Sequence, residues 1–179
     1  MKRKTPGKPI LLVALGGNAL IQKGQQGTIE QQFKNLKGPI RQIAGLSSAY
    51  RIIITHGNGP QVGNLLLQQE SCSAVPRLPL EILVAQTEGQ IGYMIESTLD
   101  EALLGQGILY RPLVTLITYV AVDRKYPAFI EPTKPIGPVI SEQSAKTLPY
   151  PVVKTAKGYR RVIDLTVSMI IVVARDLPR

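Results

Sequence analysis

The chain has 179 residues, of which 44% are hydrophobic and 5% aromatic, so it is long enough to build one ordinary domain, or a piece of a larger one, around an aliphatic core. Almost all of its formal net charge of +9 lies at the two ends, because residues 1–8 and 150–179 together hold 10 of the 21 basic side chains and 2 of the 12 acidic ones. Basic ends are more typical of solvated tails than of a groove-reading surface, which argues against nucleic acid as a partner.

The sequence also argues against a membrane protein and against a disulfide-stabilised one. No apolar run reaches the length of a transmembrane helix, and the run at 9–17 is too short for a secretory leader. Cys72 is the single cysteine, so no intrachain disulfide can form. We therefore expect a cytoplasmic protein with no membrane partner.

The first predicted elements are a strand and a helix, separated by a glycine corner. Residues 10–15 form a short apolar run that predicts a buried strand, and it ends abruptly in a Gly-Gly-Asn corner at 16–18. Thr28 and Gln31 have the spacing of a capping box at the start of a helix. Pro39 lies inside this helix and predicts a kink or a local break.

A second strand is predicted at 50–55, where β-branched residues dominate. It runs into another glycine-rich corner, HGNGPQVG, and then into a short helix. A longer helix begins at Leu80 and keeps one apolar face until a glycine at 105 or 107 ends it. The segment 111–122 predicts a third strand.

The order strand, helix, strand, helix, helix, strand predicts an α/β fold with a parallel sheet and helices on its faces. After Val122 the pattern changes, because the segment 123–140 holds four prolines and 149–165 predicts a small antiparallel hairpin around 156–158. This region reads as an excursion from the main sheet. A final apolar run at 167–174 predicts one more strand.

The two glycine corners are the candidate binding site. Parallel strands deliver their C-terminal ends to one edge of a sheet, where open α/β folds bind ligands, and glycines there let backbone N–H groups approach an anion. One such corner is equally well a tight turn, but two similarly built corners favour a converging anion site. Their residues are Gly16, Gly17, Asn18, Gly57, Asn58 and Gly59.

Three further residues have two interpretations each. His56, the single histidine, is either a hydrogen-bond partner that shapes the loop, which we favour, or a general base. Lys134 lies between prolines in EPTKPIGP, a rigid setting for a phosphate clamp, although an ordinary exposed lysine fits equally well. Glu88 is either a surface residue or an acceptor that fixes a loop. One histidine and one cysteine do not make a ligand set for zinc, so no metal site is expected.

Five motifs in this order, ALGGNAL, HGNGPQVG, AQTEGQIGYMIE, PTKPIGPV and KGYRRV, resemble carbamate kinase, a member of the amino acid kinase family. The resemblance runs from about Pro9 to Val162. It implies a three-layer α/β/α sandwich of the amino acid kinase type with a small protruding subdomain, here incomplete, and a homodimer. It also implies reversible phosphoryl transfer between ATP and carbamate, giving carbamoyl phosphate and ADP, in arginine metabolism.

Carried onto this chain, the resemblance implies that Gly16, Gly17 and Asn18 hold the transferring phosphoryl group. It implies that Gly57, Asn58 and Gly59 hold the carbamate end, and that Lys134 reaches back over the substrate. No general base is needed, because phosphoryl transfer depends mainly on positioning and charge neutralisation. The expected ligands are carbamate or carbamoyl phosphate, and the expected cofactor is Mg²⁺ with ATP or ADP.

The chain departs from the family pattern near Asp164, where family members continue into a second half that holds the nucleotide site. We therefore expect an N-terminal α/β substrate-binding part at 1–122, the protruding subdomain at 123–162 and a divergent tail at 163–179, without the ATP site. An alternative to the kinase is an inactive truncated fragment that binds carbamoyl phosphate or pairs with a full-length kinase subunit.

Overall fold

The computed structural model describes residues 7–109, 112–119, 121, 123, 125, 127, 130–131, 134–156, 158–163 and 170–174. These residues divide into two compact units. Unit 1 takes its residues from Met1–Gly57, Gly89–Ile117 and Met169–Arg179, and unit 2 from Asn58–Glu88 and Thr118–Ser168. Helix α2 and the start of α3 thus group with the proline-rich excursion, so the units are not continuous in sequence. The three continuous regions expected from the sequence stay a prediction.

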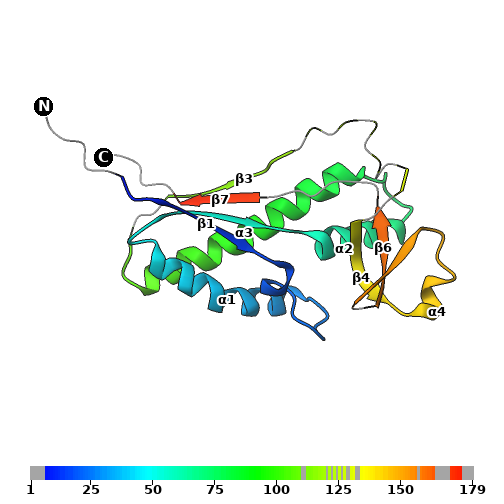
Figure 1. The fold of residues 1–179 in the computed structure, drawn as a ribbon, viewed down its shortest axis with the longest axis horizontal. Helices are drawn as coiled ribbons and strands as arrows, with labels where there is room; N and C mark the ends of the chain where they lie inside the picture. The colour runs from blue at the N-terminus through cyan, green and yellow to red at the C-terminus, as the bar shows by residue number, and fades with distance from the viewer. Residues whose placement is uncertain are drawn as a thin grey trace, which may run out of the picture. The chain divides into compact units, whose positions relative to one another are not determined.

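The elements of unit 1 are arranged around one sheet, with strands in the order β1-β2-β7-β3 (Figure 1). In chain order they are β1 (Ile10–Leu15), the 3-10 turn η1 (Gly17–Ala19), α1 (Ile29–Leu46), β2 (Arg51–His56), most of α3 (Leu80–Gly105), β3 (Leu113–Leu116) and β7 (Ile170–Ala174). Each strand predicted from an apolar run is therefore present, although β3 is shorter than the predicted segment.

The sheet of unit 1 is mixed. β1 and β2 are parallel, with Leu15 opposite His56, whereas β7 is antiparallel to its neighbours β2 and β3. β1, β2 and β3 therefore run in one direction, as their alternation with helices predicts. The expectation of a parallel sheet is wrong at β7. A parallel strand needs a crossover connection, and the described element before β7 is strand β6 rather than a helix.

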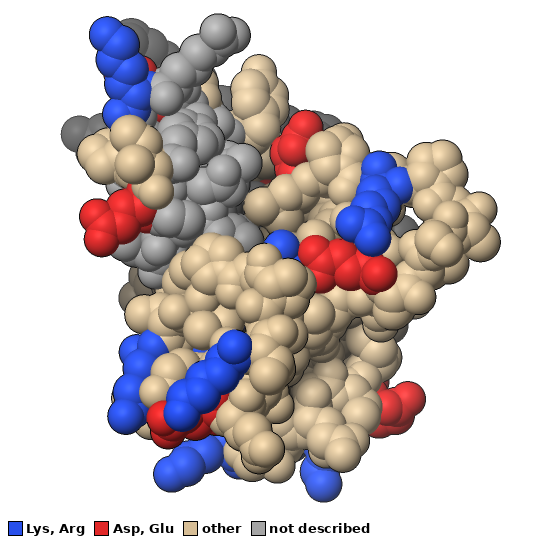
Figure 2. All heavy atoms as spheres, turned by 90° about the vertical axis from the view of Figure 1, so that its right-hand side faces the viewer, with Lys and Arg blue, Asp and Glu red and all other residues tan. Residues whose placement is uncertain are grey.

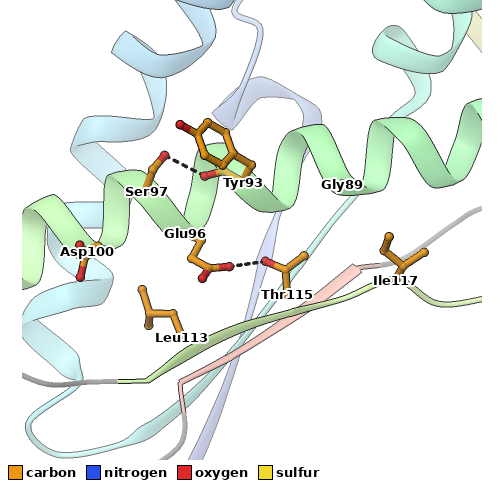
Figure 3. A pocket seen from close by; sticks show the side chains of 8 residues that line it. All are labelled: Gly89, Tyr93, Glu96, Ser97, Asp100, Leu113, Thr115 and Ile117. Carbon is orange, nitrogen blue, oxygen red and sulfur yellow. Dashed lines mark hydrogen bonds between the residues drawn. The ribbon is translucent and has the colours of Figure 1, made fainter.

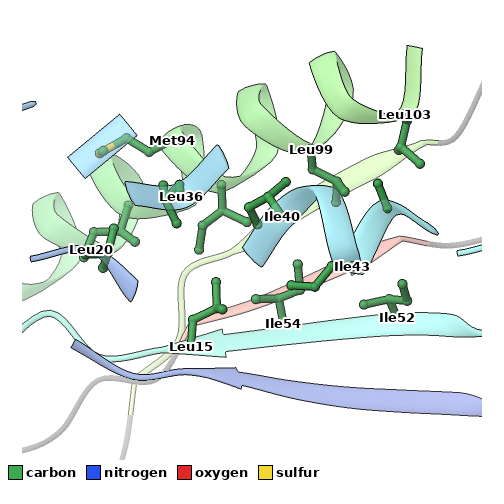
Figure 4. Packing of buried hydrophobic residues seen from close by; sticks show 13 residues of the cluster. Leu15, Leu20, Leu36, Ile40, Ile43, Ile52, Ile54, Met94, Leu99 and Leu103 are labelled. Carbon is green, nitrogen blue, oxygen red and sulfur yellow. The ribbon is translucent and has the colours of Figure 1, made fainter. Parts of the chain in front are cut away.

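The core of unit 1 lies between the inner face of the sheet and helices α1 and α3 (Figure 4). Ile52 and Ile54 of β2 are buried on this face, and alternation along the strand places them on the same side. The core is aliphatic, as the composition predicts: leucines, isoleucines, one alanine and one methionine fill it. The helical residues that complete it are Leu36, Ile40, Ile43, Ala44, Ile91, Met94, Ile95, Leu99 and Leu103.

Helix α1 begins at a capping box and continues through Pro39. Thr28 accepts from the backbone N–H of Gln31 and the Gln31 side chain accepts from the backbone N–H of Thr28, so the predicted capping box is confirmed. The predicted break at Pro39 is absent, because α1 runs on to Leu46. Leu36 and Ile40, on either side of Pro39, are fully buried, and this packing offsets the backbone hydrogen bond that proline removes.

Helix α3 ends as the sequence predicts, at a glycine. The backbone N–H of Ile108 donates to Leu103 and that of Gly107 donates to Leu104, while Gly107 has a φ of +71°. This pair of hydrogen bonds is the Schellman motif, in which the left-handed residue is usually glycine. Gly107 therefore stops the helix, and Gly105 is its last residue.

The outer face of the sheet is apolar and exposed. Ile10 and Leu12 of β1 are 57% and 63% exposed, and Val114 and Leu116 of β3 are 44% and 45% exposed. Alternation places these residues opposite the inner face that α1 and α3 cover. In the part of unit 1 that the structure describes, helices cover one face of the sheet, which gives two of the three layers that the resemblance implies.

Unit 2 combines helices with a small sheet in the order β4-β6-β5. Its elements are α2 (Gly59–Glu70), the start of α3, β4 (Lys134–Ile140), α4 (Glu142–Ala145), β5 (Val152–Thr155) and β6 (Gly158–Ile163). β5 and β6 pair antiparallel with Thr155 opposite Gly158, so the predicted hairpin is confirmed. Val62, Leu83 and Ile136 form a small buried cluster that joins α2, α3 and β4.

On the face drawn in Figure 2, lysines and arginines lie among acidic and uncharged side chains. None of the helices that the structure describes combines the length and the apolarity needed to cross a membrane.

Two glycines of α3 provide a matched test of how this helix packs against β3. A methyl group on Gly92 would overlap the Thr115 side chain, whereas one on Gly89 would meet no described atom within 4 Å. We expect Gly92→Ala to lower the free energy of unfolding by about 1–3 kcal/mol through overpacking. We expect Gly89→Ala to raise it by up to about 1 kcal/mol through helix propensity. Urea denaturation measures both, and equal effects would contradict the packing.

Candidate functional site

The first corner follows β1 and consists of Gly16, Gly17 and Asn18. Gly16 has an extended backbone, with φ of −69° and ψ of 165°, and Gly17 begins η1. Neither glycine lies in the left-handed region, and a methyl group on either would meet no described atom within 4 Å. Among the described residues, nothing therefore requires glycine at these two positions, and the two glycines leave room beside the backbone.

The second corner starts level with the first. β1 and β2 are parallel neighbours with Leu15 opposite His56, so Gly16 and Gly57 both follow the paired ends of their strands. Gly57 resembles Gly16, because a methyl group on it would also meet no described atom within 4 Å. The predicted meeting of the two corners at one edge of the sheet is thus realised in unit 1 at Gly16 and Gly57.

Asn58 is held by the side chain of Thr87, a contact that the sequence does not predict. Its Nδ2 donates to Thr87 Oγ1 at 2.9 Å, and the residue is buried. The side chain of Asn58 therefore fixes the corner to α3 and does not cap α2, which begins at Gly59. The N-terminus of α2 keeps its positive dipole end without a side-chain cap. No local signal links Asn58 to Thr87, because the two residues lie far apart in sequence.

His56 is buried at the end of β2. Its Nδ1 lies 3.3 Å from the Gly57 carbonyl oxygen, and its Nε2 has no hydrogen-bond partner among the described residues. Burial lowers the pKa of His56, and the hydrogen bond to Gly57 opposes this shift. The contact of Nδ1 with the next residue fits the loop-shaping interpretation, in which His56 holds the backbone of the corner.

Lys134 is the first residue of β4, where its backbone pairs with Ile163 of β6. A methyl group on Gly59 would lie 3.8 Å from the carbonyl oxygen of Pro135, the next residue in β4. Unit 2 therefore brings the second corner beside the strand that begins with Lys134. That Lys134 reaches over a substrate stays a prediction.

Glu88 is a buried residue, so its interpretation as a surface residue is wrong. It is fully buried, and its Oε2 accepts from the backbone N–H of Thr118 at 3.0 Å. The alternative, an acceptor that fixes a loop, is what the structure contains. Its Oε1 has no hydrogen-bond partner among the described residues.

An open groove of about 650 Å³ runs between α3 and β3 in unit 1 (Figure 3). Tyr93, Glu96 and Asp100 line it from the helix, and Glu96 Oε2 accepts from the hydroxyl of Thr115 on β3 at 2.7 Å. None of the residues predicted for the site lines this groove. It is a feature of the sheet's edge strand, separate from the glycine corners.

Known proteins with similar sequences are carbamate kinases. The carbamate kinase of Thermococcus kodakarensis is 43% identical over 163 residues, which cover 86% of this chain and 51% of the relative. The carbamate kinase of Escherichia coli K12 is 41% identical over 138 residues, which cover 77% and 45%. The chain thus spans about half the length of the curated relatives it matches. No protein-family model matches it.

Solved structures lead to the same family. The carbamate kinase from Giardia lamblia bound to citric acid has a TM-score of 0.76 and 32% identity, with 90% of this chain and 55% of that chain covered. The carbamate kinase from Giardia lamblia bound to AMP-PNP has a TM-score of 0.65 and 32% identity, with 88% and 52% covered. The chain therefore has an α/β fold of the amino acid kinase type, incomplete relative to these structures.

The lowered pKa of His56 predicts a pH dependence of stability. The folded state binds a proton less readily than the unfolded state, whose histidine has a pKa of about 6.5. We therefore expect the free energy of unfolding to be highest above that pH and to fall as the pH drops below it. His56→Asn keeps an N–H donor near Gly57 and does not titrate, so its stability should change less over the same range. Urea denaturation at several pH values tests this, and parallel curves would contradict it.

Proposed function

Because the chain is homologous to carbamate kinases over most of its length, we propose that it carries the substrate-binding part of a phosphotransferase that moves a phosphoryl group between ATP and carbamate. The observation that supports this most is that a methyl group on Gly16, Gly17 or Gly57 would meet no described atom within 4 Å. Room beside the backbone, at the C-terminal ends of parallel strands, is what phosphoryl and carbamate oxygens need to reach N–H donors.

In this proposal Gly16, Gly17 and Asn18 bind the phosphoryl group, and Gly57, Asn58 and Gly59 bind the carbamate end. The N-terminus of α2, which no side chain caps, stabilises negative charge at the second corner. The positive charge of Lys134 attracts the negatively charged ligand. None of these groups accepts a proton, since positioning and charge neutralisation carry the transfer.

The proposed cofactor is Mg²⁺ with ATP or ADP, and bound Mg²⁺ would neutralise charge on the transferring phosphates. Within the described ranges, no group of three or more His, Cys, Asp or Glu side chains could hold a metal ion. The described residues do not fit a metal cage, so no step is assigned to a protein-bound metal. We propose that the nucleotide site lies outside the described residues.

Cellular setting and assembly are part of the same proposal. We propose a cytoplasmic homodimer that acts in arginine metabolism on carbamate or carbamoyl phosphate, without nucleic acid or membrane as a partner. Cys72 is a free, exposed thiol, which suits a reducing compartment.

A second candidate function is a non-catalytic fragment that binds carbamoyl phosphate or pairs with a full-length kinase subunit. The exposed apolar residues Ile10, Leu12 and Val114 on the outer face of the sheet favour it, because such a face is commonly covered by another protein surface. A coupled assay for ATP formation from carbamoyl phosphate and ADP separates the two candidates. Turnover by the purified chain supports the kinase, and binding without turnover supports the fragment.

Binding of carbamoyl phosphate tests the site directly. We expect the purified chain to bind it in isothermal titration, and we expect Gly17→Ala to weaken binding by about tenfold or more, because the added methyl group occupies the space that the ligand needs. The thermal midpoint should stay near the wild-type value, since that methyl group meets no described atom of the chain.

Gly38→Ala is the matched control, because Gly38 lies in α1 and a methyl group there also meets no described atom within 4 Å. It should bind like the wild type. The proposed site would be contradicted if the wild type did not bind carbamoyl phosphate, or if Gly17→Ala bound it with the same affinity as the wild type. Tight binding of Mg-ATP would contradict the expectation that the ATP site is missing.

A further inference from the structure

Helix α2 and strand β4 touch backbone to backbone at Gly63 and Gly137. A methyl group on Gly63 would overlap both Cα and N of Gly137, so a larger residue at 63 would force the two elements apart. Gly137 also has a φ of +70°, which residues with a side chain rarely adopt. Both positions need glycine for the fold of unit 2, in contrast to the glycines of the two corners.

This contact lies one helical turn along α2 from the second corner and three residues along β4 from Lys134. Gly63 follows Gly59 by one helical turn, so the two residues share one face of α2. Gly137 follows Lys134 within β4, and Pro135 O lies 3.8 Å from the position of a methyl group on Gly59. A shift of α2 against β4 at the glycine contact would therefore also move the corner relative to the backbone of Lys134.

Two neighbouring arginines of β6 hold the contact. Arg160 Nε donates to the Gly137 carbonyl oxygen at 3.0 Å. Arg161 Nη1 donates to both carboxylate oxygens of Glu70 at 2.8 and 2.9 Å, and its guanidinium lies 4.1 Å from the Tyr150 ring centroid. Glu70 is the last residue of α2, so β6 binds that helix at its far end and β4 at Gly137.

The Arg161–Glu70 pair is shielded enough to matter. The two side chains are 21% and 28% exposed, and the hydrogen bonds to both carboxylate oxygens fix their geometry. Both hydrogen bonds come from the single nitrogen Nη1, so the pair is not the bidentate form with two nitrogens, but charge-assisted hydrogen bonds between partly buried groups are stronger than exposed ion pairs. Removing the side chain of Arg161 or Glu70 should loosen α2 against the small sheet, while the backbones of the helix and the sheet stay unchanged.

We propose that Gly63, Gly137, Arg160 and Arg161 are positioning residues that set Lys134 against the corner at Asn58 and Gly59 for carbamoyl phosphate. They act through Lys134 and do not touch the ligand. This inference rests on the function proposed above. The attraction between an ammonium group and a phosphate falls with distance, so a small displacement of the strand is enough to lose affinity.

A double-mutant cycle on the full chain tests this, with carbamoyl phosphate as the probe in isothermal titration. We expect Gly63→Ala to raise Kd about fivefold and Lys134→Met to raise it about tenfold. The double variant should bind like Lys134→Met alone. If Gly63→Ala weakens binding only by displacing Lys134, it has no further effect once the lysine is absent. Gly38→Ala is the control and should keep the wild-type Kd.

Independent effects would overturn the proposal: a double variant whose Kd rises by the product of the two single changes, or a Gly63→Ala variant that binds like the wild type. If circular dichroism finds Gly63→Ala unfolded, Glu70→Gln enters the same cycle. It weakens the pair with Arg161, and it should raise Kd about twofold when Lys134 is present and not in Lys134→Met. An equal rise in both backgrounds contradicts the proposal.

Failure of the proposed function gives a different result. If the wild-type chain binds no carbamoyl phosphate, that function fails, and the contact is measured by hydrogen exchange without ligand. Glu70→Gln should then speed exchange in residues 58–63 and 134–140 together. Faster exchange in one of these segments alone overturns the positioning contact as well.

Discussion

The parallel pairing of β1 with β2 is the constraint on which unit 1 depends. Leu15 lies opposite His56, so both strands leave the sheet at the same edge and the two glycine corners start level. A slip by one residue would turn Ile52 and Ile54 away from α1 and α3. One register therefore determines both the hydrophobic core and the place where an anion could meet two sets of backbone donors.

Features that depend on near neighbours could be predicted from the sequence, and features that depend on distant ones could not. The capping box of Thr28 and the hairpin whose second strand begins at Gly158 involve residues a few positions apart. The direction of β7 depends on pairing with distant strands, and Pro39 is tolerated because the residues around it are buried. Local propensity contains neither kind of information.

The same division holds for the candidate site. The glycine corners could be predicted because a strand followed by glycines is a local pattern, whereas the bond from Asn58 to Thr87 and the burial of Glu88 are consequences of packing. Gly63 and Gly137 both lie in motifs that the sequence marks, but only the structure brings them into contact. The corner glycines leave space beside the backbone, whereas at Gly63 and Gly137 the two backbones are in direct contact.

The place of β7 in the sheet has a consequence for the order of folding. β7 lies between β2 and β3, so among the described strands β3 joins the sheet through one that comes later in the chain than the other described elements. During synthesis β1, β2 and α1 can assemble first, while β3 waits for the described strand with which it pairs. Completion of the sheet then requires the closure of long loops, which is slow and leaves strand edges exposed to other chains in the meantime.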